Sequence, residues 1–391
     1  MKKLLAELKE FPRKGDMVLL LLCLFTSAFG VLVVASATNA AEKFGSNLRY
    51  ILVQIVATLL GVLAYAVISS IDVEALAERR RGLVAFNTFM LLLLIPFGTT
   101  NGGNRSWLSI PLLPIDIQAA EVCKITYIVI MASVMNSHQN RISHLYSLGH
   151  LAMHMAMFVG LNLVISGDMG VSLIFVFTTV AMAFAGGLSM LWFVLGGLSV
   201  AVGFPIIWKF VLKEYQRSRI LVLFDPSIDP LGLDERWQAV RSLKSLTGGG
   251  LTGQGLFNGY RTQNGLMFAP HTDYVFSSIG EELGFLGCLL VIVLELAIVI
   301  RCIMVGIRTP NYMRRLICFG AAAALMFQNI VNIGMCIGVM PVIGITLPFI
   351  SYGGSSVISL YAMLGLVSGV CARPDHLSHE RYIQPPRNAL N

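Results

Sequence analysis

Long runs of apolar residues alternate with short polar joints along most of the chain. A helix needs about 20 apolar residues to cross roughly 30 Å of hydrocarbon, and runs of this length recur about ten times. The pattern predicts an all-α polytopic membrane protein with transmembrane helices at 17–37, 50–70, 82–98, 119–135, 147–165, 170–186, 189–208, 283–304, 314–338 and 352–371. Only Gly186-Gly187-Leu188 separate the sixth run from the seventh, so that division rests on a very short joint.

Composition excludes a soluble globular domain. Hydrophobic residues make up 56% of the chain, charged residues 13%, and the mean hydropathy is +0.75. The net charge of +7 comes largely from the polar joints, which indicates contact with anionic membrane lipids and gives no support to nucleic-acid binding. All seven cysteines lie in or beside the apolar runs, so we expect packing residues and no disulfide framework.

The distribution of Lys and Arg among the short joints predicts the orientation. Basic residues precede the first run, follow the second, and separate the eighth from the ninth: Lys2, Lys3, Lys9, Arg13, Lys14, Arg79, Arg80, Arg81, Arg308, Arg314 and Arg315. Both termini are therefore expected in the cytoplasm, with a single membrane domain over 1–371 and a cytoplasmic tail over 372–391. The large loop at about 209–282, between the seventh and eighth helices, is then extracytoplasmic.

Three carboxylates lie where this long loop meets the eighth apolar run. Asp273, Glu281 and Glu282 are close to the expected hydrocarbon boundary, where ionised groups are costly to keep. Such a cluster favours a working site, with Asp273 as its centre. The alternative is an acidic anchor at the membrane interface.

A second candidate site lies at the outer end of the fourth helix. Glu121 and Lys124 are spaced i and i+3 and share one helix face, so a buried pair would mainly neutralise itself. The alternative is contact with a substrate, in which Arg105 would provide a fork for a phosphate. Asp168 could cap the sixth helix at its N-terminus or belong to the same site.

Weaker signals occur in the remaining exterior segments. Arg217 and Arg219 belong to a mixed basic and apolar stretch that suggests an interfacial helix. The glycine-rich segment 248–255 could present backbone N–H groups to a phosphate. Ser351, Ser355 and Ser356 introduce the tenth helix and suit either a broken helix beside a cavity or ordinary helix packing.

Four blocks, taken in order, resemble the SEDS family of bacterial cell-wall proteins, which contains RodA, FtsW and SpoVE. The first runs from Gln118 through Glu121 to Lys124 and is similar to Gln-Pro-Ser-Glu-x-x-Lys, although Ala119-Ala120 replace Pro-Ser. The second is Gly167-Asp168-Met169-Gly170, and the third is His271-Thr272-Asp273-Tyr274-Val275-Phe276 followed by Glu281-Glu282-Leu283-Gly284. The fourth comprises Asn332-Ile333-Gly334 and then Pro348-Phe349-Ile350-Ser351-Tyr352-Gly353-Gly354-Ser355-Ser356.

The resemblance implies a peptidoglycan glycosyltransferase that polymerises lipid II at the outer face of the bacterial cytoplasmic membrane. It implies that Asp273 is the catalytic base of an inverting transfer, assisted by a divalent cation such as Mg²⁺ or Mn²⁺. The implied substrate-binding residues are Arg105, Gln118, Glu121, Lys124, Asp168, Arg217, Arg219, His271, Thr272, Glu281, Glu282, Ser351, Ser355 and Ser356.

The implied partners are a class B penicillin-binding protein, which is a transpeptidase, and other proteins of the elongation or division complexes. The motifs do not separate cell shape, division and sporulation roles, although the compact N-terminus is slightly more RodA-like. One alternative is a transporter that flips lipid II across the membrane, for which we expect an internal repeat that the sequence lacks. Another is a non-catalytic scaffold for the transpeptidase.

Overall fold

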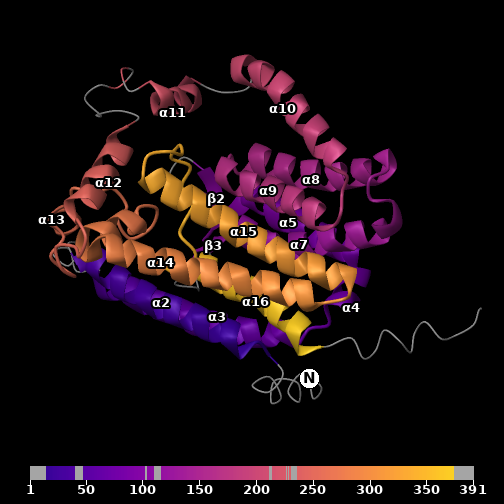
Figure 1. Cartoon of the computed structure of the whole chain (residues 1–391), viewed down its shortest axis with the longest axis horizontal. Helices are drawn as coiled ribbons and strands as arrows, with labels where there is room; N and C mark the ends of the chain where they lie inside the picture. The colour runs from indigo at the N-terminus through magenta and orange to yellow at the C-terminus, as the bar shows by residue number, and fades with distance from the viewer. Residues whose placement is uncertain are drawn as a thin grey trace, which may run out of the picture.

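The computed structural model describes residues 15–39, 47–101, 104–109, 116–210, 214–225, 227, 229 and 236–373. Within these ranges the predicted set of long apolar helices is confirmed (Figure 1). They are α2 (Met17–Ala37), α3 (Asn47–Ser69), α5 (Arg80–Leu92) with its short continuation α6 (Leu94–Phe97), α7 (Ala119–Ser137), α8 (Leu145–Ile165), α9 (Met169–Ala185), α10 (Met190–Phe210), α14 (Val275–Arg308), α15 (Tyr312–Cys336) and α16 (Gly354–Ala372). A turn at Gly186-Gly187 separates α9 from α10, so the predicted division between the sixth and seventh helices is confirmed.

The first residue of α14 differs from the prediction. The helix begins at Val275, not at 283, and Gly284 interrupts it with φ 67° and ψ −162°. Glu281 and Glu282 therefore lie inside the outer part of the helix and are fully buried, whereas the sequence placed them just before it. Their charge suggested that the helix begins after them. The groups that bind the two carboxylates lie at residues 261–263 and on α2, and the local sequence pattern does not show these contacts.

The joints contain short elements, some of which an all-α prediction does not include. A three-stranded antiparallel sheet, in the order β1 (Gly98–Asn101), β2 (Asn104–Leu108) and β3 (Ile117–Gln118), precedes α7. Pairing of Trp107 with Gln118 in this sheet sets the position of Gln118 at the N-terminus of α7. The other short elements are α4 (Val73–Glu78), the 3₁₀ helix η2 (Gln139–Arg141), α11 (Glu214–Phe224), α12 (Trp237–Gly248) and α13 (Tyr260–Gln263).

Helix α16 is the most enclosed of the long helices, and it packs along α3. Small residues allow this close contact: a Cβ at Gly365 would lie 2.8 Å from the Tyr65 carbonyl oxygen, and one at Gly369 would lie 2.9 Å from that of Ser69. Helix α15 packs between α14 and α9. Close backbone approach at small residues is how helices associate inside a membrane, where lipid removes the hydrophobic drive between them.

Helices α2 and α14 are joined by polar contacts near both of their ends. At one end the Arg301 guanidinium donates to both carboxylate oxygens of Asp16, at 2.8 and 3.0 Å. At the other end the Ser36 hydroxyl donates to the Glu282 carboxylate. These two contacts fix the register of the two helices against each other.

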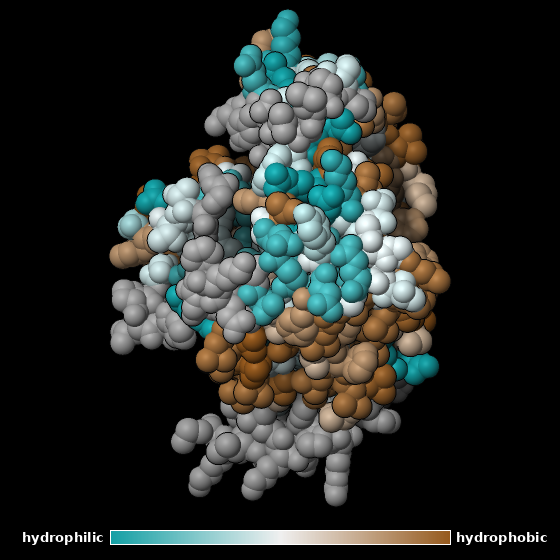
Figure 2. Space-filling model, turned by 90° about the vertical axis from the view of Figure 1, so that its left-hand side faces the viewer, coloured by the Kyte–Doolittle hydropathy of each residue, from teal (hydrophilic) through white to brown (hydrophobic). Residues whose placement is uncertain are grey.

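The surface is divided between a hydrophobic belt and a hydrophilic end. Figure 2 views the molecule from the end that carries α12 and α13, where hydrophilic residues gather above a hydrophobic lower region. Helix α10 stands apart from the other helices in Figure 1, and its apolar side chains are largely exposed, as those of Val200 and Val202 are. Such a helix suits contact with lipid or with another protein.

Candidate functional site

Asp273 lies two residues before α14, at the end of the helix bundle that carries α12 and α13. Burial raises the pKa of its carboxyl group to about 6. The side chain is half-buried, and its carboxylate has no hydrogen-bond partner among the described residues. A carboxylate in this state is partly desolvated, unpaired and ionised near neutral pH, which are the properties of a general base.

The backbone at Asp273 is held by the C-terminal part of α15. The Asn332 side-chain amide donates to the carbonyl oxygen of Asp273 at 2.8 Å and to that of Ile345 at 2.7 Å. A single buried side chain thus connects the residue to the segment that follows α15. That segment passes beside the carboxylate, since a Cβ at Gly344 would lie 3.7 Å from the Asp273 Oδ2 atom.

The two residues before Asp273 contact the segment that introduces α16. The Ser351 hydroxyl donates to the Thr272 carbonyl oxygen at 2.6 Å, and the Tyr352 N–H donates to the His271 carbonyl oxygen at 2.8 Å. The Leu347 N–H donates to the Ser351 hydroxyl oxygen at 2.9 Å. Both hydrogen-bonding roles of this hydroxyl are therefore used, and Ser351 positions the site through the backbone.

A second polar cluster gathers around Asp168, which caps α9 as one of the two sequence readings proposed. Its Oδ1 atom accepts from the Val171 N–H at 3.1 Å, and its Oδ2 atom accepts from the Gln118 side chain at 3.2 Å and from Ser106 at 3.4 Å. Burial raises the pKa of this carboxyl group. The Gln118 N–H in turn donates to the Ser355 hydroxyl at 3.1 Å, so the segment 351–355 links this cluster to Asp273.

Glu121 and Lys124 form a buried ion pair within α7. The Lys124 ammonium lies 3.0 and 2.9 Å from the two carboxylate oxygens of Glu121 and 3.3 Å from the side-chain oxygen of Gln328. Only 1% of Lys124 and 3% of Glu121 is exposed. The charges therefore neutralise each other inside the bundle.

Glu281 and Glu282 contact the turn at residues 261–263 and not Asp273. The Glu281 carboxylate accepts from the backbone N–H groups of Arg261 and Thr262 at 2.8 and 2.9 Å, and from the Thr262 hydroxyl at 2.6 Å. The Glu282 carboxylate accepts from Gln263 at 2.7 Å and from Ser36. Both side chains anchor the turn that contains α13, and the described structure does not bring them together with Asp273.

The glycine-rich segment 248–255 docks on the break in α14. The Gln254 and Gly255 N–H groups donate to the carbonyl oxygens of Glu281 and Glu282 at 3.0 and 2.9 Å, and the Phe285 N–H donates to the Gly250 carbonyl oxygen at 2.9 Å. The approach is so close that a Cβ at Gly253 would lie 2.1 Å from the Glu282 carbonyl oxygen. These N–H groups are already used by the helix, so they do not form the phosphate-binding loop that the sequence suggested.

Comparison with known proteins places the chain in a family. Residues 16–375 match the family model described as cell cycle protein, the group of FtsW, RodA and SpoVE. The chain belongs to this family.

Relatives match along almost the whole chain. A probable peptidoglycan glycosyltransferase FtsW of Trichlorobacter lovleyi is 32% identical over 366 residues, which cover 91% of this chain and 93% of the relative. The peptidoglycan glycosyltransferase MrdB of Escherichia coli is 29% identical over 357 residues, with 91% and 93% covered.

Solved structures of this family show the same architecture. A chain from a peptidoglycan synthase complex, described as coordinating polymerization and crosslinking, is similar with a TM-score of 0.77 at 29% identity, covering 95% of this chain and 99% of that one. The crystal structure of the rod shape determining protein RodA of Thermus thermophilus has a TM-score of 0.67 at 25% identity, covering 95% and 98%. The predicted helical membrane fold is therefore that of the FtsW, RodA and SpoVE family.

The remaining candidate residues of this family member are dispersed. Arg105 is exposed on β2, and its Nε atom donates to the Gly98 carbonyl oxygen at 3.1 Å. Arg217 lies on α11 and donates to the Lys209 carbonyl oxygen at 2.8 Å, whereas the side chain of Arg219 lies outside the described residues. Ser356 is buried at the start of α16, and its hydroxyl has no partner among the described residues. Of the basic candidates, Arg105 is the one with an exposed side chain beside the Asp168 cluster.

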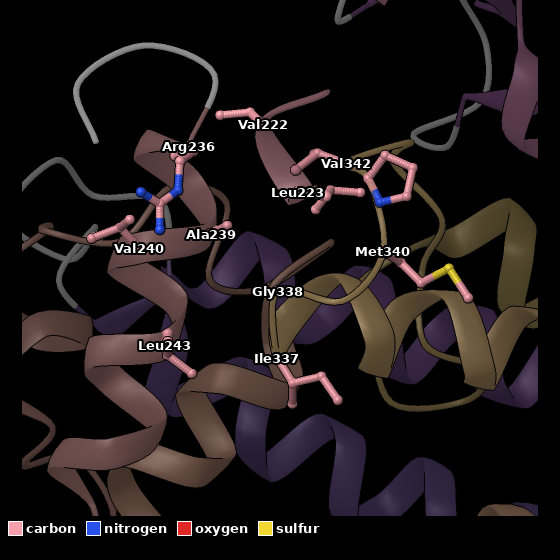
Figure 3. Close-up of a pocket in the computed structure, with 11 residues that line it drawn as sticks. Val222, Leu223, Arg236, Ala239, Val240, Leu243, Ile337, Gly338, Met340 and Val342 are labelled. Atoms are coloured by element: carbon pink, nitrogen blue, oxygen red, sulfur yellow. The ribbon is translucent and has the colours of Figure 1, made fainter. Parts of the chain in front are cut away.

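A separate pocket lies between α11, α12 and the segment after α15 (Figure 3). Apart from Arg236 its lining is mostly apolar: Val222, Leu223, Ala239, Val240, Leu243, Ile337, Gly338, Met340, Pro341 and Val342. Such a lining suits an apolar group and lacks the polar donors that a sugar requires.

The expected divalent cation finds no ready protein site. Among the described residues no group of three His, Cys, Asp or Glu side chains lies close enough together to hold a metal ion. Within the part of the chain that the structure describes, no second carboxylate joins Asp273, since Glu281 and Glu282 are bound to the turn at residues 261–263.

Sequence reasoning missed Tyr50 and the amide of Asn332. Tyr50 lies in the first turn of α3, far from Asp273 in sequence, and its ring centroid lies 5.0 Å from that of His271. An aromatic residue at the end of a transmembrane helix is usually an interface anchor, so nothing in the pattern distinguished Tyr50. The motif around Asn332 was noticed, but its bond to the Asp273 backbone required the fold.

Proposed function

We propose that this chain is a peptidoglycan glycosyltransferase that polymerises lipid II at the outer face of the bacterial cytoplasmic membrane. Lipid II is a disaccharide-peptide carried on a polyprenyl pyrophosphate. The observation that carries the proposal is the half-buried Asp273 carboxylate, which has a pKa of about 6 and no partner among the described residues, in a chain whose relatives bear the name of this activity.

The proposed step is a single displacement at the anomeric carbon of the donor sugar. Asp273 accepts the proton of the acceptor hydroxyl while the oxygen attacks that carbon, and the bond from the carbon to the pyrophosphate oxygen breaks. The polyprenyl pyrophosphate leaves with the electron pair, and the configuration is inverted because a single attack comes from the opposite face. One carboxylate is sufficient for this chemistry.

The leaving pyrophosphate requires positive charge, and Arg105 is the best candidate. Its guanidinium is exposed on β2, next to Ser106, which contacts Asp168. Lys124 is assigned a positioning role, since Glu121 and Gln328 already bind its ammonium in a buried site. Gln118 and Asp168 would then orient the loop that presents Arg105.

The proposed orientation puts Asp273 outside the cell and both termini in the cytoplasm. The basic residues at the opposite ends of the helices support it. We further propose a class B penicillin-binding transpeptidase as a partner, because a related chain occurs in a complex described as coordinating polymerization and crosslinking.

The test is polymerisation of labelled lipid II by the purified protein, alone and with its transpeptidase. Asp273→Asn keeps the shape of the side chain and removes its basicity, so we expect no glycan strands from this variant. Asp225→Asn is the matched control, because Asp225 is an exterior aspartate whose carboxylate is exposed and bonds to Ser227. Strands from Asp273→Asn at a rate near that of the control would refute the assignment, and translocation of lipid II without any strands would favour the transporter.

A further inference from the structure

Three aromatic rings from distant parts of the chain meet beside Asp273. Tyr50 comes from the first turn of α3, His271 from the segment before α14, and Tyr352 from the segment before α16. The ring centroids are separated by 5.0 Å for Tyr50 and His271, 5.0 Å for Tyr50 and Tyr352, and 5.8 Å for His271 and Tyr352. The three rings form one continuous cluster at the exterior end of the bundle.

The polar atoms of this cluster form no hydrogen bond to any described residue. Neither the hydroxyl groups of Tyr50 and Tyr352 nor the ring nitrogens of His271 have a hydrogen-bond partner among the described residues. All three side chains are half-buried, so part of each ring is open. Burial lowers the pKa of His271, so its ring is neutral at pH 7 and offers one donor and one acceptor.

Charged groups flank the cluster on one side. Arg49 precedes Tyr50 in α3, Asp116 precedes β3, and both act electrostatically on the Tyr352 hydroxyl. The cluster is also close to the proposed base, because only Thr272 lies between His271 and Asp273, which keeps their Cα atoms within about 7 Å. A group of mutually tilted rings with polar edges therefore lies next to a carboxylate.

We propose that Tyr50, His271 and Tyr352 form a saccharide subsite that holds the acceptor sugar of the polymerisation reaction. The apolar face of a pyranose ring covers the aromatic rings, and its hydroxyl groups bond to the unused polar edges. This arrangement presents one sugar hydroxyl to Asp273. The assignment deepens the proposed polymerase function and rests on it for the identity of the sugar.

Packing alone is an insufficient explanation of the cluster. The segment that carries His271 is already held by Ser351, by the Tyr352 backbone and by Asn332, without any of the three rings. The polar tips of the three half-buried rings are therefore free of any structural role among the described residues. Rings that combine an apolar face with an accessible polar tip can offer both to a ligand.

The test compares Tyr50→Leu with Tyr50→Phe, using Tyr260→Leu as a control on the same face. Tyr260 is 63% exposed on α13 and lies outside the cluster. We expect Tyr50→Leu to raise the KM for lipid II about tenfold with kcat changed less than about threefold, because one aromatic contact is lost. Tyr50→Phe keeps the ring and should recover the part of this loss that comes from the ring face, and resistance of Tyr50→Leu to pulse proteolysis equal to that of wild type would exclude a defect in folding.

A binding measurement separates this proposal from the polymerase assignment. The probe is the soluble disaccharide N-acetylglucosaminyl-N-acetylmuramic acid, followed by saturation-transfer NMR with the protein in nanodiscs. We expect saturation to reach the sugar in wild type and in Asp273→Asn, and to be lost in Tyr50→Leu. Saturation transfer to the sugar in Tyr50→Leu equal to that in wild type, or no transfer in wild type, would refute the subsite. This result would stand even if Asp273 proves to be the catalytic base.

Discussion

Removing one partner of the Glu121 and Lys124 pair is predicted to destabilise the protein far more than removing both. Glu121→Gln leaves a buried ammonium, and Lys124→Met leaves a buried carboxylate, since the side chains are only 3% and 1% exposed. Each single change should cost about 3–5 kcal/mol, the usual cost of an uncompensated buried charge. That is a large share of the roughly 5–15 kcal/mol that stabilises a typical folded domain.

The double variant Glu121→Gln/Lys124→Met is the informative one. It buries no unpaired charge, so its stability should return to within about 1 kcal/mol of wild type. If Lys124 only positions α7, polymerisation should return with the stability. The assays are pulse proteolysis in detergent and strand synthesis from labelled lipid II.

The control is the partly exposed ion pair of Arg314 and Glu74, in which the Arg314 Nε atom lies 3.1 Å from the Glu74 Oε1 atom. Glu74→Gln should cost less than about 1 kcal/mol, because solvent screens an exposed pair. A double variant that is stable yet inactive would refute the positioning role and give Lys124 a direct contact with substrate. Single variants as stable as the control would refute the burial argument itself.

Three further perturbations test other parts of the site. Because burial raises the pKa of Asp273 to about 6, kcat/KM should be flat above about pH 7 and fall tenfold per unit below about pH 6 as the base is protonated; a flat profile down to about pH 4.5 would contradict this. Gly284→Ala places a Cβ 2.4 Å from the Gly253 nitrogen at a φ of 67°, so it should expose the loop at 249–263 to protease, whereas Gly196→Ala, with open space around it, should not. Asp168→Ala should lower stability by about 1 kcal/mol through loss of the α9 cap, and Asp168→Asn should recover most of it; equal melting temperatures for the two variants would argue against capping.

The membrane helices could be predicted because apolar length alone determines them. No comparable signal marks the first two turns of α14, since Glu281 and Glu282 resemble loop charges until the turn at 260–263 is seen to bind them. The strands before α7 are too short to leave a periodic pattern. Local pattern therefore predicted the spans but not the contacts that bury a charge.

The candidate site was predicted in part for a related reason. Asp273 stands out because a carboxylate near hydrocarbon is costly wherever the chain folds. Tyr50 and Asn332 are ordinary residues for a transmembrane helix, and only the packing of α3 and α15 brings them to Asp273. Residues that act through tertiary proximity leave no mark in the one-dimensional pattern.

The two polar contacts between α2 and α14 are separated by a distance that can be compared with the thickness of the membrane. Asp16 and Ser36, the two partners from the α2 side, are 20 residues apart along an uninterrupted helix, or about 30 Å at about 1.5 Å per residue. That length matches the roughly 30 Å of hydrocarbon in a typical bilayer. The length of this helix pair thus sets the depth of the Asp273 carboxylate relative to the lipid headgroups. The two helices cannot slide along each other without breaking the polar contact at each end.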